Sequence, residues 1–429
     1  MRIIHTSDWH LGQYFYGKSR ANEHQQFLTW LLAQVEQHQV DAVIVAGDVF
    51  DTGTPPSYAR EMYFDFIAKL TKLECSLIIL AGNHDSVAML TESKQILASL
   101  SVQVIANAEP DKIEQQVIAI KDRQGTTQGL VCAIPFIRPR DVISSKTGQS
   151  ADDKKQDLQQ AISEYYQQTF SYAEKIKASL ANKNIPIIAT GHLTTVGVTT
   201  SDSVRDIYIG TLEAFPANAF PKANYIALGH IHKPQIVAKS DHIRYCGSPI
   251  PLSFDEAKHD KQVLLVDFEK EKLTKITSLV VPRFQAMAMV KTQLAELVSD
   301  VEALVAQQSF MNDEDLHAKN NTLWLDIEIE SADYLNDLHQ QITQLTQDLP
   351  IEVLLVRRSK KARQQMSQST DKTTLSELTL AEVFTQRLEL ESWQTEVQQA
   401  QQQRLTTLFN TVINDVQSAH DTMERERNE

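Results

Sequence analysis

The chain has 429 residues, 42% of them hydrophobic and 22% charged, and a formal net charge of −14 at pH 7. This length exceeds one small core and predicts two or three domains of roughly 100 to 200 residues, while the balanced composition excludes a disordered or fibrous chain. The start lacks a signal peptide and no apolar run approaches the ~20 residues of a membrane span, so we expect a cytoplasmic protein without a membrane partner. Three scattered cysteines predict neither a disulfide framework nor a zinc knuckle. The acidic charge argues against diffuse electrostatic binding to nucleic acid, although bound divalent cations would offset it locally.

The first part of the chain alternates between predicted strands and helices. An apolar run over residues 2–6, a helical pattern around residues 27–35 and a second run over 42–46 form a β-α-β rhythm, which a helix over 57–72 and a strand over 76–81 continue. A loop and a helix are expected between residues 144 and 184. Further strands are predicted at 129–134, 185–190, 225–227, 242–246 and 262–268. Residues 1–280 therefore form a layered α/β domain.

The pattern changes after Pro282. A helical stretch over 292–307, an alternating strand over 323–329, a helix ending near Leu345 and a strand over 351–356 predict a small α/β domain of residues 281–358 with a β-α-β core. Residues 359–374 are polar and basic and read as a linker. Residues 375–429 carry two apolar stripes at helical spacing, Leu380 to Leu388 and Leu405 to Val416. Such stripes either fold back on the chain or dock on another protein.

Five short motifs directly follow predicted strands. They are Asp8-Trp9-His10, Gly47-Asp48-Val49-Phe50-Asp51, Gly82-Asn83-His84-Asp85, Gly191-His192 and Gly229-His230-Ile231-His232. Any one of them alone is most simply a turn. Together they meet at one edge of a layered α/β fold, where ligands bind, and they supply imidazole and oxygen donors for divalent metals. The set predicts a two-metal site that cleaves phosphoesters.

The order of these motifs resembles the calcineurin-like metallophosphoesterase superfamily. The stretches Thr6 to Gly12, Ala46 to Thr52, Leu228 to Lys233 and Tyr245 to Pro249 narrow the resemblance to the SbcD family, the nuclease subunits of bacterial SbcCD complexes. Tyr208-Ile209-Gly210 and Val353 to Ser359 extend it over nearly the whole chain. The resemblance implies a layered calcineurin-like metallophosphoesterase sandwich with a small α/β capping domain that binds DNA and C-terminal helices.

The resemblance also assigns the site, with two divalent ions per chain. It implies one metal on Asp8, His10, Asp48 and His232, and a second on Asp48, Asn83, His192 and His230, so that Asp48 bridges them. His84 would be the catalytic histidine, which stabilises the phosphorane or protonates the leaving oxygen. Asp51 would orient His84, although it could instead cap the following helix. The resemblance implies Mn²⁺, while the donors alone also admit Mg²⁺, Fe²⁺ or Zn²⁺.

The substrate and partners likewise come from the resemblance. It implies an ATP-dependent double-strand 3′ to 5′ exonuclease and single-strand or hairpin endonuclease of DNA repair, replication and recombination, associated with the nucleoid. An SbcC-type coiled-coil ATPase would bind the C-terminal helices, and the nuclease domains would form a homodimer within a heterotetramer. Candidate DNA contacts are Lys18, Arg20, Arg138, Arg140 and Lys233. Each of these residues could instead be an ordinary solvated surface charge. A stand-alone phosphomonoesterase acting on nucleotides or phosphoproteins and a non-catalytic scaffold are the competing hypotheses.

Overall fold

The computed structural model describes residues 1–143, 151–204, 214–309, 322–330, 338–359, 380–389, 393 and 398–413. Its contacts divide the chain into two units, one of Met1–Phe15 with Ser19–Phe284, the other of Tyr16–Lys18 with Gln285–Glu429. The division at Phe284 falls close to the boundary expected at residue 280. Apart from Ser359, the expected linker over 359–374 lies outside the described residues.

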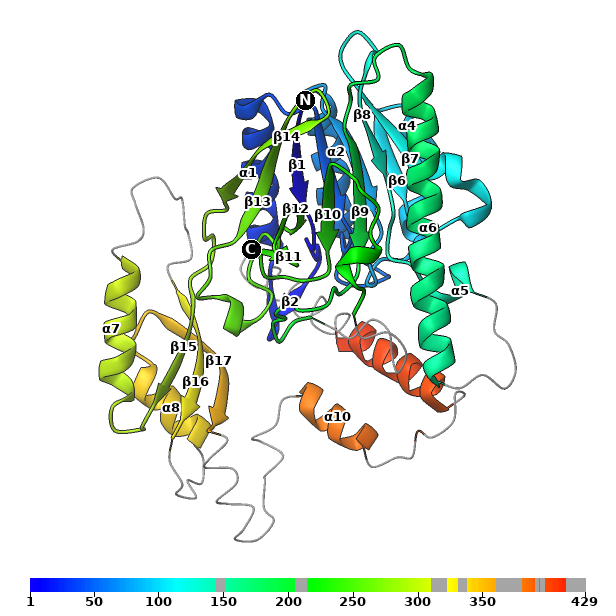
Figure 1. The fold of residues 1–429 in the computed structure, drawn as a ribbon. Coiled ribbons are helices and arrows are strands. Elements are labelled where there is room, and N and C mark those ends of the chain that lie inside the picture. Colours follow the sequence, from blue (N-terminus) through cyan, green and yellow to red (C-terminus); the bar gives the residue numbers. More distant parts are fainter. Residues whose placement is uncertain are drawn as a thin grey trace. The chain divides into compact units, whose positions relative to one another are not determined.

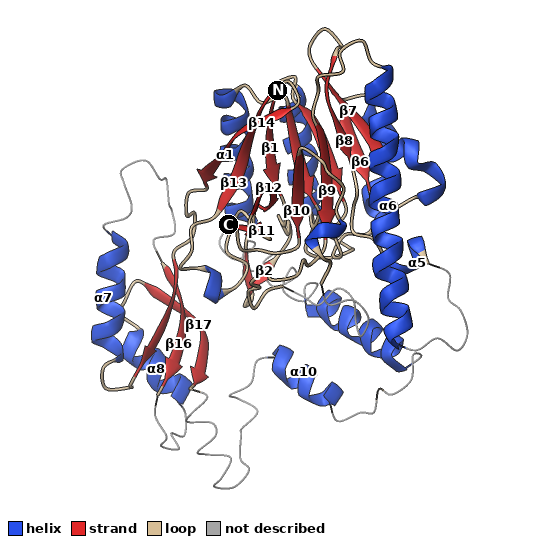
Figure 2. Cartoon of the chain, viewed as in Figure 1, coloured by secondary structure: helices blue, strands red, loops and turns tan. Residues whose placement is uncertain are grey.

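The first unit contains two six-stranded sheets (Figure 1, Figure 2). One has the order β14-β13-β1-β4-β5-β6, and the other has the order β11-β12-β10-β9-β8-β7. The first comprises β1 (Arg2–Thr6), β4 (Ala42–Ala46), β5 (Ser76–Leu80), β6 (Val102–Ile105), β13 (Gln262–Glu269) and β14 (Lys272–Val280). The second comprises β7 (Val117–Lys121), β8 (Thr127–Cys132), β9 (Ile187–His192), β10 (Tyr225–Gly229), β11 (Gln235–Val237) and β12 (Ser240–Tyr245).

Helices cover the outer face of each sheet. The first sheet packs on α1 (Ala21–His38) and α2 (Ser57–Thr71), and the second packs on α6 (Ala151–Ser179). Shorter elements connect them: β2 (Tyr14–Phe15), β3 (Lys18–Ser19), α3 (Val87–Thr91), α4 (Lys94–Ala98), η1 (Pro110–Gln116), α5 (Pro139–Val142), η2 (Ala217–Ala219) and η3 (Phe254–Glu256). The predicted layered α/β sandwich is therefore confirmed, with helices outside and sheets inside.

Strands buried on both faces explain the apolar runs in the sequence. In β4, Ala42, Ile44 and Ala46 lie in the core between the two sheets, whereas Val43 and Val45 point toward α1 and α2. Successive side chains of a strand face opposite sides, so a central strand covered on both sides needs apolar residues throughout. The apolar runs therefore mark the strands that lie at the centre of a sheet covered on both faces.

The parallel pairing of the central strands brings the motifs together. β1, β4 and β5 pair in parallel, as do β9 and β10, so their carboxyl ends share an edge within each sheet. The sequence did not predict β6, β7, β11 or β14. β14 has no apolar run because it lies at the sheet edge and most of its side chains are exposed or half-buried.

The helix expected between residues 144 and 184 is α6, and residues 144–150 lie outside the described residues. It packs through Leu158, Ile162 and Tyr166, all buried. Its scattered apolar residues thus form one face of a covering helix. The three cysteines, Cys75, Cys132 and Cys246, are free thiols and all are buried.

The second unit contains a parallel sheet of β15 (Met287–Thr292), β16 (Leu323–Ile329) and β17 (Ile351–Arg358), packed on α7 (Leu297–Ser309) and α8 (Leu338–Thr346). The sequence missed β15, and the helix expected to begin at Thr292 begins at Leu297 instead. The lobe is therefore β-α-β-α-β. In the tail, α10 (Leu380–Glu389) packs against a helix over 398–413. The rings of Phe384 and Phe409 are stacked there, with their centroids 4.0 Å apart. Among the described helices, none has the length and apolarity to cross a membrane.

Candidate two-metal centre

All five motifs lie at the ends of their strands and their loops interlock. Asp8 follows β1 and donates its backbone N–H to the Gly47 carbonyl, 3.0 Å away, just after β4. His10 donates in the same way to the Asp48 carbonyl at 3.1 Å. Across to the second sheet, the His230 N–H donates to the Asp8 carboxylate at 2.9 Å. The two sheets are thus joined by hydrogen bonds at the predicted site itself.

The backbone is unusual at four of the predicted ligands. Asp8, His10, Asp48 and His230 have φ angles of 54°, 48°, 51° and 91°. Residues with a side chain rarely adopt this left-handed region, and each such residue costs of order 1 to 3 kcal/mol. Such strain persists only where the surrounding structure enforces it and clusters at functional sites.

Glycines in the motifs allow the loops to approach closely. A Cβ on Gly47 would lie 2.2 Å from Nδ1 of His192, and one on Gly82 would lie 2.1 Å from Oδ1 of Asp48. A Cβ on Gly229 would lie 1.9 Å from the Ala46 carbonyl oxygen. All three values are far inside van der Waals contact, so these positions exclude any side chain.

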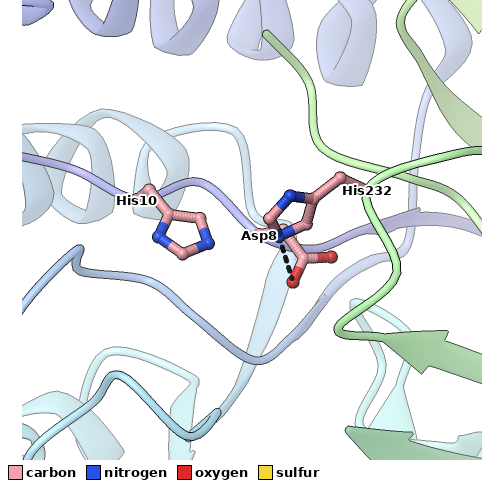
Figure 3. A group of neighbouring side chains, drawn as sticks. All are labelled: Asp8, His10 and His232. Atoms are coloured by element: carbon pink, nitrogen blue, oxygen red, sulfur yellow. Dashed lines mark ion pairs between the residues drawn. The ribbon is translucent and has the colours of Figure 1, made fainter. Parts of the chain in front are cut away.

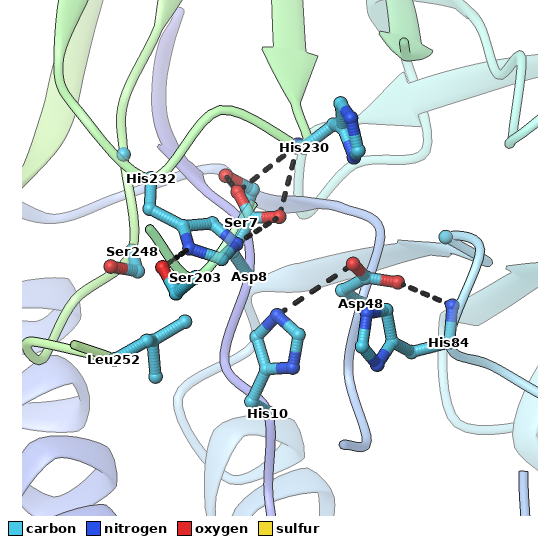
Figure 4. Close-up of polar contacts among 12 residues, drawn as sticks. Ser7, Asp8, His10, Asp48, His84, Ser203, His230, His232, Ser248 and Leu252 are labelled. Carbon is cyan, nitrogen blue, oxygen red and sulfur yellow. Dashed lines mark hydrogen bonds and ion pairs between the residues drawn. The ribbon is translucent and has the colours of Figure 1, made fainter. Parts of the chain in front are cut away.

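The predicted ligands gather into overlapping groups whose donor atoms lie within 4.8 Å of one another. One group is Asp8, His10 and His232 (Figure 3). The others are His10, Asp48 and His84, and Asp48, His192 and His230. Asp48 belongs to two of them: its Oδ2 is 3.6 Å from Nε2 of His10 (Figure 4). The same oxygen is 3.2 Å from Nε2 of His192.

The amide oxygen of Asn83 lies beside the group of Asp48, His192 and His230. That oxygen lies 3.0 Å from Nε2 of His192 and 3.2 Å from Nδ1 of His230. The structure therefore brings together all seven residues predicted as metal ligands, from both sheets.

Protein oxygens fix the outward nitrogen of three of these histidines. Nδ1 of His192 donates to the Ala46 carbonyl at 2.9 Å, Nδ1 of His10 lies 3.0 Å from the Asp51 carboxylate, and Nδ1 of His232 lies 2.5 Å from the Ser203 hydroxyl. An acceptor on Nδ1 leaves Nε2 as the basic nitrogen that faces the cluster, which is how metal-binding histidines are oriented.

Two buried nitrogens support a metal in this cluster. Within the described residues, Nε2 of His10 and Nε2 of His230 have no hydrogen-bond partner. Burying a polar atom without a partner is costly, and both nitrogens belong to groups of metal-ligand type. The donor set of imidazoles, carboxylates and one amide fits two divalent cations.

The electrostatics of the cluster point the same way. Burial lowers the pKa of His192, but the charge of Asp48 and the hydrogen bond to it outweigh burial and raise that pKa to about 9. Burial also lowers the pKa of His10, but the hydrogen bond to Asp51 and the charges of the neighbouring carboxylates outweigh burial, so this pKa is raised overall. Burial raises the pKa of Asp48, yet the charges of His192 and His84 hold it well below its usual range. The cluster thus attracts positive charge, and a metal would replace the protons because its ligands must be deprotonated.

Asp51 contacts both His84 and His10. Its backbone carbonyl accepts from Nδ1 of His84 at 2.7 Å, while its carboxylate faces Nδ1 of His10. A carbonyl can only accept, so Nδ1 of His84 carries a proton and Nε2 is the ring nitrogen left to accept or donate one. The Asp51 side chain therefore orients the ligand His10, and its backbone orients His84. The alternative cap is not formed, because the N-cap of α2 is Pro56.

Sequence reasoning missed the residues that support these loops. The buried Asp85 carboxylate accepts backbone N–H groups from Gly82 at 2.8 Å, Phe50 at 3.0 Å and Val49 at 3.1 Å, so it ties two motifs together. The buried Glu256 and Lys261 form an ion pair behind His232. Asp85 stood inside a motif, but Glu256 and Lys261 carried no distinguishing spacing.

The predicted DNA contacts differ in their exposure. Arg20 is completely buried; its guanidinium pairs with Glu23 and donates to the Pro251 carbonyl at 2.7 Å. The prediction of a DNA contact at Arg20 is therefore wrong, because its donors are already used inside the protein. Arg140 is 78% exposed. Arg138 is half-buried and donates to the Asp85 carbonyl at 3.1 Å.

Lys233 is also half-buried, and Lys18 forms an ion pair with Glu352 inside the second unit. The described structure therefore leaves Arg140 as the most accessible of the five predicted cations.

Comparison with known proteins places this fold and site in a class. A family model described as calcineurin-like phosphoesterase matches residues 1–234, and another described as type 5 capsule protein repressor C-terminal domain matches residues 283–392. The layered sheets and the ligand cluster lie in the first matched region. They define a calcineurin-like metallophosphoesterase that holds divalent metals.

Curated relatives narrow the class. The SbcD subunit of the SbcCD nuclease from Escherichia coli strain K12 is 51% identical over 98% of this chain and 100% of its own length. The protein of the same name from Rhodobacter capsulatus is 34% identical over 62% of this chain and 66% of its own. The chain belongs to the SbcD family, the nuclease subunits of SbcCD complexes, which favours the nuclease hypothesis over a stand-alone phosphomonoesterase.

Among solved structures, a dimetal phosphatase from Danio rerio has a TM-score of 0.36 and 10% identity over 66% of this chain and 99% of that chain. A similarity this weak supports no conclusion about the fold or the function of this chain.

Proposed function

We propose that the chain is the DNA-cleaving subunit of an SbcCD-type complex and hydrolyses phosphodiester bonds at a two-metal centre. The observation that carries this proposal is the shared position of Asp48 between ligand groups drawn from both sheets. Asp8, His10, Asp48 and His232 would hold one ion, and Asp48, Asn83, His192 and His230 would hold the other. When bound, the ions supply Lewis-acid activation of the phosphoryl group and a nucleophile at neutral pH.

The protein's own residues orient this centre and move a proton. The Asp51 carbonyl fixes the tautomer of His84, so Nε2 of His84 is the group that stabilises the transition state or protonates the leaving oxygen. The Asp48 carboxylate is itself held, because its Oδ1 accepts the His84 backbone N–H at 2.9 Å. A shift of one loop would therefore move both the bridging carboxylate and the catalytic histidine.

We propose Mn²⁺ as the working ion and DNA as the substrate, cut as a double-strand 3′ to 5′ exonuclease and a single-strand or hairpin endonuclease. The DNA substrate accords with the names of the relatives that match nearly the whole chain. The exposed Arg140, together with Lys233, Arg138 and Lys18, is the set of cations proposed to contact the backbone, and the DNA would associate the protein with the nucleoid in the cytoplasm.

The test is a cleavage assay on labelled hairpin and blunt duplex DNA, with Mn²⁺, Mg²⁺ or Zn²⁺ in parallel and a phosphomonoester as competing substrate. We expect Mn²⁺-dependent DNA cutting and little phosphomonoester turnover. Arg140→Ala should raise the KM for DNA several-fold and leave turnover of a small phosphodiester unchanged, with the exposed Arg123→Ala as the matched control. Efficient phosphomonoester hydrolysis without DNA cleavage would contradict the proposal.

We also propose that the tail helices bind an SbcC-type coiled-coil ATPase, through which ATP controls cutting, and that nuclease domains pair as a homodimer in a heterotetramer. In the helix over 398–413, Leu408 and Val412 lie one turn apart and are 58% and 50% exposed. Apolar side chains at this spacing are typical of a helix that docks on a partner. Leu408→Asp with Val412→Asp should abolish co-purification of the ATPase while DNA cutting by the chain alone persists. Thr407→Asp is the control, because Thr407 is exposed and directly precedes Leu408 in the same helix. Unchanged binding by the double variant would refute the docking site.

A further inference from the structure

His232 is held by a buried network that lies outside the five motifs. Its Nδ1 is 2.5 Å from the Ser203 hydroxyl (Figure 4). Ser203 in turn donates to the Glu256 carboxylate. The same Glu256 oxygen lies 3.3 Å from Nδ1 itself, a longer contact than the one through Ser203. The second oxygen of Glu256 accepts from Lys261 Nζ at 2.5 Å and from the Leu252 backbone N–H at 3.0 Å. Glu256 and Lys261 are 3% and 6% exposed, so this ion pair is not a solvated surface pair.

The same network also fixes the backbone of His232. Its carbonyl accepts from Lys261 Nζ and from the Ser248 N–H, both at 3.1 Å. Ring and backbone of one ligand are therefore held by a single charge pair. Isolated buried charge pairs contribute little stability compared with an apolar replacement, so a role in orienting His232 accounts for this pair better than stability does.

The Ser203 segment is itself fastened to the same place. Ser201 Oγ donates to Glu256 at 2.6 Å, the Asp202 N–H lies 3.4 Å from the Asp255 carboxylate, and Thr199 exchanges two hydrogen bonds with Gln235. The position of Ser203 beside the imidazole is thus set by several contacts on both sides of it.

We propose that Ser203 and Glu256 form a positioning relay for His232, which makes the metal site of Asp8, His10 and His232 depend on the segment over 199–204. The hydroxyl of Ser203 accepts a hydrogen bond from Nδ1 and donates its own O–H to Glu256, so Nε2 of His232 is kept free as a ligand and the ring cannot rotate. This inference rests on the two-metal centre proposed above. Partners of this kind typically change metal affinity 10- to 100-fold.

The test measures Mn²⁺ binding to the full metal-free chain by calorimetry, with electron paramagnetic resonance to report the coupling of two ions. Ser203→Ala should weaken one of the two sites about tenfold and leave the other within twofold. Ser203→Thr, which keeps the hydroxyl, should restore the affinity. Ser253→Ala is the matched control, because the Ser253 hydroxyl also donates to Glu256, at 3.2 Å, whereas of these two serines it is Ser203 that bonds the His232 ring.

Ser203→Ala is preferred to Glu256→Gln as the main variant because it leaves the charge pair intact; Glu256→Gln serves as a second variant and should show the same loss at the same site. Unchanged Mn²⁺ affinity in Ser203→Ala, an equal loss at both sites, no rescue by threonine, or the same loss in Ser253→Ala would each overturn the relay. A wild-type chain that binds fewer than two ions would instead overturn the two-metal proposal, so the two failures are distinguishable.

Discussion

Gly82→Ala tests whether the Asp48 carboxylate, the proposed bridge between the two ions, must sit where the structure places it. A Cβ at this position would lie 2.1 Å from Oδ1 and 2.4 Å from the backbone N of Asp48. Ordinary contact begins near 3.4 Å, so the carboxylate or its loop has to move by about 1 Å, and a displacement of about 1 Å costs roughly 100-fold in rate. That factor corresponds to about 2.7 kcal/mol of lost transition-state stabilisation.

The assay is Mn²⁺-dependent hydrolysis of bis(p-nitrophenyl) phosphate, which needs no partner, with thermal unfolding measured in parallel. Gly53→Ala is the matched control, since its Cβ would meet Ser86 at 3.6 Å, an ordinary contact, and we expect its kcat within twofold of wild type. A Gly82→Ala variant that retains more than a third of wild-type kcat would refute the steric reasoning. An equal loss in Gly53→Ala would show that the loops tolerate no added methyl group anywhere.

Three further predictions concern proton transfer, pH and metal. His84→Ala should bind two Mn²⁺ ions by calorimetry yet lose at least ~100-fold in kcat; wild-type cleavage by this variant would remove His84 from the mechanism. His5 and His24 are fully buried, and burial lowers the pKa of each to about 3. Histidines in the unfolded chain have a pKa near 6.5, so below that pH the unfolded chain binds more protons than the folded chain. The free energy of unfolding therefore falls as the pH is lowered from about 6.5 to 3, by about 2 kcal/mol per histidine at pH 5. Urea unfolding of the chelated protein at pH 7.5 and 5.0 is compared between wild type and His24→Leu, so that the opposite contribution of His192, whose pKa is raised, cancels. The variant should lose about 2 kcal/mol less between the two pH values than wild type; the same pH dependence in both proteins would contradict the assignment. Chelation of wild type should lower the unfolding temperature and Mn²⁺ should restore it, whereas a temperature independent of metal would argue against binding to the folded state.

The gathering of the proposed ligands at one place could be predicted from sequence, because each motif pairs a strand end with a residue type suited to metal binding. His192 and His230 each follow a glycine. The missing Cβ of Gly191 leaves room for the Tyr166 hydroxyl, and that of Gly229 leaves room for the Ala46 carbonyl, and both glycines are visible in the sequence alone. Glu256 and Lys261 could not be found in this way. Two opposite charges five residues apart in a loop read as surface residues, and only the packing of the loop against His232 buries them.

The same limitation explains the error at Arg20. An arginine close to a metal motif resembles a phosphate contact in sequence, whereas its burial depends on Phe15, Glu23 and the distant Pro251 carbonyl. β15 was missed for a related reason. Its residues alternate between buried Met287 and Val290 and exposed Met289 and Lys291, and such a short mixed pattern becomes a strand only when β16 pairs with it.

The left-handed backbone of Asp8, His10, Asp48 and His230 changes how a mutational scan of this protein should be designed. Alanine at any of these positions removes a ligand but keeps the conformational penalty, so its instability mixes two causes. Glycine, or asparagine in place of aspartate, tolerates the same backbone and separates them. Glycine variants at these four positions would lose the proposed ligand and also the conformational penalty, so they are expected to gain folding stability in the metal-free chain. A screen for thermostability alone would therefore tend to select variants without the centre.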